Sequence, residues 1–310
     1  MSQRGAWDFT VVNHITEGEF GTTPTTGAWL PVSLVKRLDV SYRPVMRPKV
    51  GLGRQNPSDW TVAKKLYEFD LELELIKAEA SPAYNWYTLV QYIIEKAATA
   101  NGVPDTVLES FSLAATADLA TDEFWWLKGC MLDRVELAGR RVDELVTATL
   151  HGLAQWGDYG TTDPVSGSAT RQAQPAVLAQ IPFGDCDVLY DPTTPASILD
   201  DVDSFRLSLI RELDPRGVAT GGLYRTFMPK SCRWEVELSK DFDSKTELEH
   251  FIDSTKTKCT IEIPNVAGGK IFALTSGYWM PGSGLPVNEL DLLNLRLTGE
   301  FATLAVSDHG

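Results

Sequence analysis

The chain has 310 residues, and its 28 Lys and Arg against 42 Asp and Glu give a formal net charge of −14 at pH 7. This balance argues against sequence-independent binding of DNA or RNA, which requires clustered cationic side chains. No apolar run reaches the ~20 residues that span a membrane, and the first residues, MSQRGAWDF, lack the apolar core of a secretory signal.

The residue types that carry catalysis are scattered along the chain. No histidine lies at HExxH spacing, and GLGRQ at Gly51–Gln55 lacks the GK[ST] ending of a phosphate-binding loop. A hard cation is an alternative for the cluster around Asp200, Asp201 and Asp203, but the glycine and terminal glutamate of a calcium loop are absent. We therefore predict no enzyme, no cofactor and no metal. The scattered cysteines are expected to be reduced structural thiols: Cys130, Cys186, Cys232 and Cys259.

Residues 1–35 are predicted to form an irregular N-terminal arm. Gly, Thr and Pro dominate its segment Glu17–Val32, EGEFGTTPTTGAWLPV, in which Phe20 and Trp29 are isolated aromatic residues. Such a segment can be disordered alone and become ordered on a partner.

Residues 36–155 are predicted to form a first β-domain. A strand at Leu38–Tyr42 precedes Arg43–Asp59, which is rich in Pro, Gly, Arg and Lys and is predicted to be a long loop. Tyr67–Leu75 is the clearest strand, because apolar and acidic side chains alternate with a period of two. A helix is predicted from Pro82 to about Glu95, with proline at its first position. Further strands are predicted at Glu109–Ala115, Glu123–Cys130 and Arg141–Leu153.

Residues 156–180 are predicted to be a linker, because Gly, Ser, Thr and Pro dominate them. A second β-domain, 181–310, then follows the same plan, with a long loop at Arg211–Lys230 and a shorter helix at about Ser244–Ser254. Its predicted strands are Phe205–Ile210, Arg233–Leu238, Lys258–Ile263, Lys270–Tyr278 and Leu290–Ala302.

The order strand, long loop, strand, helix, strand, strand thus occurs twice. Late in each half an apolar strand ends at a glycine, Gly129 or Gly277, and is followed by VDEL (Val142–Leu145) or VNEL (Val287–Leu290). A repeat of this length is not a solenoid unit, since those recur every ~20–50 residues. It predicts two tandem, mostly antiparallel β-sandwich or barrel domains, each with one flanking helix.

The polar side of Tyr67–Leu75 is acidic. The ordinary explanation is an antiparallel sheet with one face in water. Four carboxylates in one row nevertheless repel like charges on neighbouring strands, and the matching strand Arg233–Leu238 repeats the pattern. The repetition favours a surface that has to be negative. Its members are Glu68, Asp70, Glu72 and Glu74, with Glu235 and Glu237 in the second half.

These features resemble the tail tube proteins of siphoviruses, the long-tailed viruses of bacteria and archaea. The Phe-Gly-Thr-Thr-Pro sequence inside Glu17–Val32 is similar to their N-terminal segment, and the repeated element order resembles their β-sandwich with a flanking helix. The resemblance covers nearly the whole chain, counted over two copies. It implies a structural protein of the virion tail, made in the host cytoplasm and without contact to a membrane.

The resemblance also implies how the chain would act. Subunits of this family form stacked rings around a channel through which genomic DNA is ejected, and a trimer of a duplicated chain would give a pseudo-hexameric ring; a true hexamer is the alternative. Tape measure, terminator and baseplate proteins would be its partners. The six acids above become candidates for lining the lumen, which would repel DNA without binding it. The arm and the long loops supply candidate contacts to the next ring: Phe20, Trp29, Arg43, Arg47, Lys49, Arg54, Arg211, Arg216 and Arg225.

Two other functions remain open. A tail terminator, baseplate hub or secretion-tube component would share the fold and form a single ring. A carbohydrate-binding or hydrolytic β-sandwich would use exposed tryptophans as stacking platforms, although such residues more often fill cores or interfaces. The tryptophans concerned are Trp125, Trp126, Trp156 and Trp279.

Overall fold

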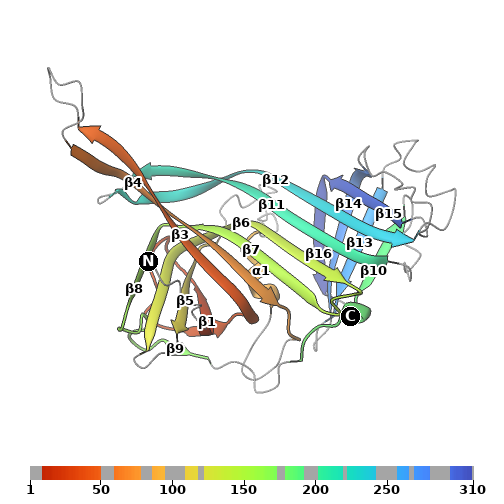
Figure 1. Cartoon of the computed structure of the whole chain (residues 1–310), viewed down its shortest axis with the longest axis horizontal. Coiled ribbons are helices and arrows are strands. Elements are labelled where there is room, and N and C mark those ends of the chain that lie inside the picture. The colour runs from red at the N-terminus through yellow and green to blue at the C-terminus, as the bar shows by residue number, and fades with distance from the viewer. Residues whose placement is uncertain are drawn as a thin grey trace, which may run out of the picture.

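The computed structural model describes residues 9–49, 59–77, 86–94, 109–117, 122–172, 179–191, 202–218, 222–241, 257–264, 269–279 and 294–308. Strands dominate these residues, which confirms the predicted mainly β fold (Figure 1). The elements in chain order are β1 (Phe9–Thr16), β2 (Ala28–Pro31), β3 (Leu34–Lys49), β4 (Asp59–Glu74), α1 (Tyr87–Gln91), β5 (Phe111–Ala117), β6 (Glu123–Arg140), β7 (Val146–Ala154), β8 (Trp156–Gly160), β9 (Thr170–Arg171), the 3₁₀ turn η1 (Phe183–Asp185), β10 (Asp187–Asp191), β11 (Val202–Val218), β12 (Tyr224–Asp241), β13 (Thr257–Ile263), β14 (Lys270–Trp279), β15 (Asn294–Phe301) and β16 (Thr303–Asp308).

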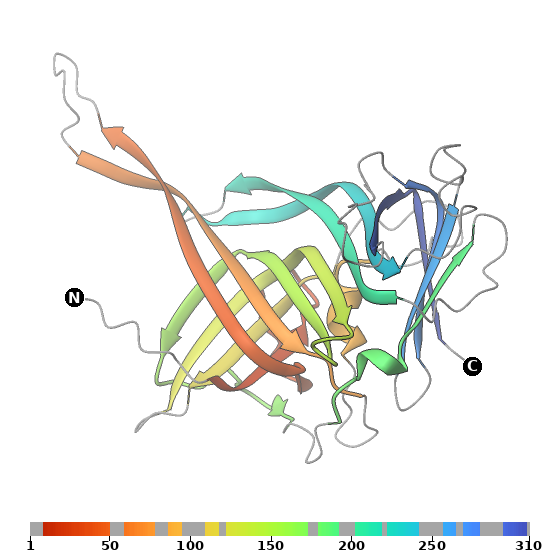
Figure 2. The same cartoon turned by 45° about the vertical axis from the view of Figure 1, so that its right-hand side comes forward.

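A central antiparallel sheet runs through the molecule in the order β3-β4-β7-β6-β11-β12-β15. At one end of the molecule β6 bends out of this sheet and pairs with β5 and β8, and β1 and β2 continue this second layer. At the other end β14 leaves β15 to pair with β13 and β16, and β13 pairs with β10. Each end of the central sheet is therefore closed by its own second layer (Figure 2).

The strand pairings of residues 9–172, the first unit, recur in residues 179–308, the second unit. Pairings β1·β5, β3·β4 and β4·β7 correspond to β10·β13, β11·β12 and β12·β15. Pairings β5·β6, β6·β7 and β6·β8 correspond to β13·β14, β14·β15 and β14·β16. The two units meet where β6 of the first pairs with β11 of the second. We call this pairing the seam.

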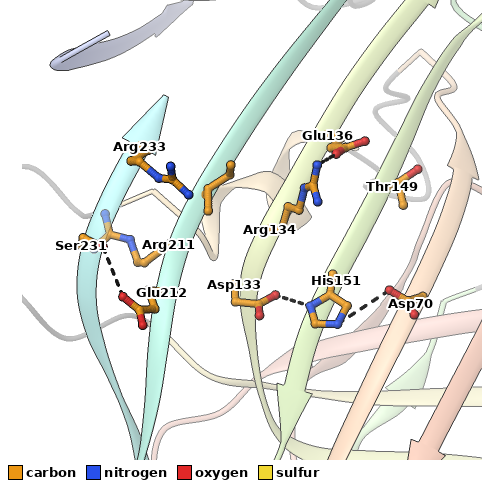
Figure 3. A pocket seen from close by; sticks show the side chains of 11 residues that line it. Asp70, Asp133, Arg134, Glu136, Thr149, His151, Arg211, Glu212, Ser231 and Arg233 are labelled. Atoms are coloured by element: carbon orange, nitrogen blue, oxygen red, sulfur yellow. Dashed lines mark hydrogen bonds and ion pairs between the residues drawn. The ribbon is translucent and has the colours of Figure 1, made fainter. Parts of the chain in front are cut away.

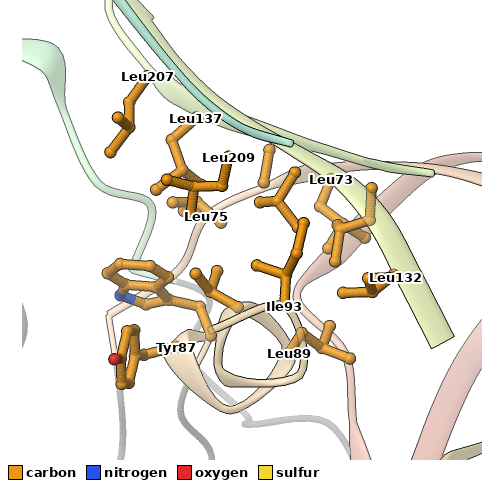
Figure 4. Close-up of a cluster of buried hydrophobic side chains, with 14 of the residues drawn as sticks. Leu73, Leu75, Tyr87, Leu89, Ile93, Leu132, Leu137, Leu207 and Leu209 are labelled. Atoms are coloured by element: carbon orange, nitrogen blue, oxygen red, sulfur yellow. The ribbon is translucent and has the colours of Figure 1, made fainter. Parts of the chain in front are cut away.

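The core lies on one side of the central sheet. Phe69, Leu71 and Leu73 of β4 are at most 2% exposed, as their alternation with acidic residues predicts. Helix α1 lies inside the predicted helical range and packs beneath the sheet, with Leu89 and Ile93 in the same buried cluster (Figure 4). The predicted second helix, Ser244–Ser254, lies outside the described residues.

Part of the predicted irregular arm is sheet. β1 pairs with β5 along its length, and β2 pairs with both β1 and β9. The prediction of an irregular arm is therefore wrong for these residues. The physical reason is that β1 is buried on both faces: Val12 lies in the main core, and Ile15 on the opposite face lies in a smaller cluster around the fully buried Trp29.

The two predicted long loops are mostly strand as well. β3 continues to Lys49 and β4 begins at Asp59, so Arg43–Lys49 is half of a hairpin rather than a loop. The range Arg211–Lys230 likewise belongs to β11 and β12 except for the residues between these strands. Proline predicts a loop because it cannot donate a backbone hydrogen bond to a sheet. Among the described residues, however, β3 is bonded only to β4, and such an edge strand tolerates Pro44 and Pro48.

The predicted linker also contributes to the sheets. β8 pairs with the first half of β6, and β9 pairs in parallel with β2. Trp125 of β6 stacks on Tyr159 of β8, with ring centroids 5.2 Å apart. This contact and the strand pairings hold the segment in the sheets, although its Gly- and Thr-rich composition predicted a linker.

A buried carboxylate ties the N-terminal segment to the first unit. Glu17, only 7% exposed, accepts hydrogen bonds from the hydroxyls of Ser110 (2.8 Å) and Ser112 (2.6 Å). It also accepts from the backbone N–H groups of Gly21 (2.8 Å) and Gly129 (2.9 Å). Both glycines have positive φ, 73° and 61°, which residues with a Cβ rarely adopt. This Glu17 clamp fixes the turn around Phe20 against β6.

We expect Glu17→Ala to destabilise the protein strongly. It leaves four donors without their acceptor, and a single buried donor without a partner costs about 1–3 kcal/mol. We predict a loss of at least about 3 kcal/mol in the free energy of unfolding, measured by urea denaturation. The matched control is Glu19→Ala at an exposed position nearby, which should change stability by less than about 0.5 kcal/mol. Equal effects of the two substitutions would contradict the clamp.

Candidate functional site: the polar face of the central sheet

All six predicted lumen-lining acids lie on the side of the central sheet that faces away from the core. We call this side the polar face. Strand register places Glu72 in one cross-strand row with Thr149, Glu136, Ser208 and Glu235. Glu68, Asp70 and Glu74 alternate with buried residues of β4, and Glu237 lies two residues beyond Glu235 on β12. The face is therefore continuous across the seam.

Cations are interleaved with these acids. Arg43 Nε lies 2.9 Å from Glu68 Oε2, and Lys36 Nζ lies 2.7 Å from Glu74 Oε1. In the second unit, a nitrogen of Arg206 lies 3.4 Å from an oxygen of Glu237, and a nitrogen of Arg233 lies 3.6 Å from an oxygen of Glu235. These arginines and the lysine relieve the cross-strand repulsion between carboxylates. The acids alone predict a negative surface, whereas the face mixes both signs of charge.

A cavity of about 700 Å³ opens on the polar face at the seam (Figure 3). Charged and polar side chains of β4, β6, β7, β11 and β12 line most of it. Its lining residues are Asp70, Asp133, Arg134, Glu136, Thr149, His151, Ile210, Arg211, Glu212, Ser231 and Arg233.

His151 lies between two carboxylates of this cavity. Its Nδ1 is hydrogen-bonded to the carboxylate of Asp133, and its Nε2 lies 3.9 Å from Asp70 Oδ1. The hydrogen bond to Asp133 raises the pKa of His151 above its usual value of 6.5, against the opposing effect of burial. The shift in register between Leu132 and Arg134 brings Asp133 to this place. Without this shift, the alternation that places Arg134 and Glu136 on the polar face would turn Asp133 toward the core. The pair therefore has no signature in the sequence.

The site is rich in charged side chains. Among the described residues, no three or more His, Cys, Asp or Glu side chains are grouped to hold a metal ion. The four thiols are free, and burial raises the pKa of Cys259 to about 12, which keeps that thiol protonated and unreactive. No helix in the described part of the chain is long and apolar enough to span a bilayer.

The predicted inter-ring residues occupy diverse positions. Trp29 is fully buried and Arg211 is 2% exposed, so neither side chain is available at the surface of this chain. Phe20 packs edge-to-face on Phe227, with ring centroids 5.4 Å apart. Arg43, Arg216 and Arg225 are exposed; Arg47 and Lys49 lie on β3, and Arg54 lies outside the described residues.

The model of the phage tail tube protein family matches residues 10–301 of the chain, which is nearly its whole length. No curated protein matches the chain.

We expect the His151–Asp133 pair to make stability depend on pH. A raised folded-state pKa means that protonated His151 stabilises the fold. This contribution is fully present below pH 6.5 and is lost as the pH rises through the folded pKa. NMR titration should give His151 a pKa above 6.5 that falls in Asp133→Asn. His14 is the internal control: burial lowers its pKa to about 4, and Asp133→Asn should not move it. An unchanged His151 titration in Asp133→Asn would rule out the pair.

Proposed function

Because the chain belongs to the phage tail tube protein family, and is thus a structural subunit of a viral tail, we propose that three copies close into a ring of six similar units. Rings of this kind stack into the tube of a siphovirus-type tail, and DNA leaves the virion through the channel. Tape measure, terminator and baseplate proteins are the partners that such a tube requires. The proposal is carried by one observation, the seam.

The seam joins two similar units by unlike edges. Arg134–Arg140 of β6 pairs with Ser204–Ile210 of β11, in an antiparallel register without interruption. β11 is the counterpart of β3. We call the edge of a unit formed by β3 or β11 its entry edge, and the opposite edge, formed by β6 in the first unit, its exit edge. At the seam the exit edge of the first unit therefore pairs with the entry edge of the second. A head-to-tail contact of this kind generates a ring when its rotation closes. The same contact between chains would add unit after unit until the ring is complete.

The entry edge of the first unit is open for such a contact. Among the described residues β3 is bonded only to β4. Tyr42 of β3 is 45% exposed, whereas its counterpart Leu209 of β11 is fully buried at the seam. An uncovered edge strand is a template for pairing with another chain, and proteins generally cover or blunt it. The occupant that fits best is a second copy of this chain.

The polar face is the side that would line the channel. The opposite side of the central sheet is covered by α1 and by the second layers, which leaves the polar face open. Its acids would repel phosphate groups, and its ion-paired arginines would be held by carboxylates rather than by DNA. Such a wall lets DNA slide without retaining it.

The stoichiometry is tested by native mass spectrometry with negative-stain microscopy of the purified protein. We expect rings or tubes whose smallest closed species contains three chains. Rings of six chains would contradict the equivalence of the two units. A monomer at all concentrations would contradict self-assembly.

We expect Tyr42→Asp to weaken ring formation without unfolding the chain. Tyr42 is exposed and packs on Tyr67 in a tilted contact with ring centroids 5.1 Å apart, so the new charge would be desolvated only when a neighbour covers β3. The control is Tyr159→Asp on β8, because Tyr159 is 63% exposed and also contacts an aromatic ring, that of Trp125. Equal assembly of the two variants, by mass photometry over a range of concentrations, would argue against β3 as the contact edge.

We expect reversal of charge on the polar face to slow DNA release. Asp70→Lys with Glu72→Lys would add cations to the proposed channel wall, where phosphates bind them. The measurement is the rate of triggered DNA release from virions that carry the variant. The matched control, Asp122→Lys with Asp143→Lys, makes the same change of charge at exposed positions outside the polar face. Equal rates for the two double variants would sink the channel assignment.

A further inference from the structure

The hairpin of the second unit lies on the first unit of the same chain. Phe227 of β12 is 1% exposed and shares a buried cluster with Met131 and Leu153. The backbone carbonyl of Tyr224 accepts a hydrogen bond of 2.7 Å from Nε2 of Gln155. Together with the contact between Phe20 and Phe227, these interactions seat the hairpin. We call this site the hairpin seat of the first unit.

The β3–β4 hairpin has the same register as the β11–β12 hairpin. Pro48 lies opposite Trp60, and Pro215 lies opposite Phe227. The separation along the chain is also the same, since 60 − 48 and 227 − 215 both equal 12 residues. Both hairpins reach to the same side of the molecule, and β3–β4 extends beyond its body (Figures 1 and 2). Trp60 therefore has the position in the first unit that Phe227 has in the second.

In the described part of the second unit, the counterpart of the hairpin seat is uncovered. Met131 pairs with Leu153 in the first unit, and Tyr278 pairs with Glu300 in the second. Leu153 and Glu300 lie opposite Glu68 and Glu235, which are themselves equivalent, so Met131 and Tyr278 are counterparts. Met131 is 3% exposed beneath Phe227, whereas Tyr278 is 44% exposed.

From this difference we propose that the β3–β4 hairpin of one chain lies on the second unit of the neighbouring chain in the same ring. Trp60 then takes, over Tyr278, the place that Phe227 has over Met131. The inference rests on the proposed ring, and it names the contact that completes each boundary between chains.

Charge supports the same pairing. The free hairpin carries Arg47 and Lys49 beside Pro48, at the positions of Asp214 and Arg216 in the other hairpin. The rim of the uncovered seat offers a carboxylate, since the side chain of Glu300 is 44% exposed and lies 4.0 Å from Arg233 Nη1 at its Oε1. A basic hairpin with a central aromatic residue fits an exposed tyrosine beside a carboxylate. Contacts between chains would differ from those within a chain in charge while keeping their shape.

Disulfide trapping tests the contact directly. Trp60→Cys and Tyr278→Cys are combined in a Cys232→Ser background, because Cys232 is an exposed natural thiol. Mild oxidation of assembled rings should give a covalent species of three chains on a denaturing gel, and each single cysteine variant should give none. Ladders beyond three chains would place the hairpin on an adjacent ring and overturn the inference.

A matched pair of alanine variants separates folding from assembly. Phe227→Ala removes the aromatic ring that fills the hairpin seat of the same chain, and it should therefore lower the midpoint temperature of thermal unfolding of the isolated chain. Trp60→Ala should leave that midpoint unchanged and raise the concentration needed for assembly by at least about tenfold. Normal rings from Trp60→Ala, with no disulfide in the double cysteine variant, would overturn the inference and leave the proposed ring intact. Failure of the unmodified protein to form rings would instead overturn the proposed function itself.

Discussion

The seam between β6 and β11 is the contact on which the rest of the structure depends. On its core side, Leu137 and Leu207 face each other and are fully buried, so pairing of the edges also closes one hydrophobic core over both units. On its other side, the same strands present Glu136 and Ser208 to the polar face. A single row of backbone hydrogen bonds thus makes both the core and the polar face continuous across the two units.

Period-two alternation predicted most of the strands, because it is a local property. The strand Tyr67–Leu75 and most strands of the second half follow from it, whereas β10 and β16 were not predicted. On β4, the burial of Phe69 and its apolar neighbours leaves the four acids, Glu68, Asp70, Glu72 and Glu74, on the other side of the sheet, as alternation predicts. What alternation cannot provide is the identity of the strand that lies alongside. The seam, which joins residues about 70 positions apart, has no local signature.

The errors share a physical cause. Charged residues and prolines between Arg43 and Lys49 predicted a loop, because such residues are rare in strands that have one buried face. A hairpin that projects from the body has little core of its own, so composition says little about its backbone. The Glu17 clamp escaped prediction for a different reason. This lone carboxylate in a Gly- and Thr-rich segment gains three of its four partners, Ser110, Ser112 and Gly129, from residues in or next to β5 and β6, far away in the sequence.

One strand, β6, belongs to four ladders, with β5, β7, β8 and β11. Its 18 residues make it the common member of both layers of the first unit and of the seam. Separating the two units would require breaking a row of backbone hydrogen bonds together, rather than sliding one side chain past another. Within a chain the two units are therefore expected to move as one rigid body. In the proposed ring, the same strand pairing between chains would stiffen every other boundary as well.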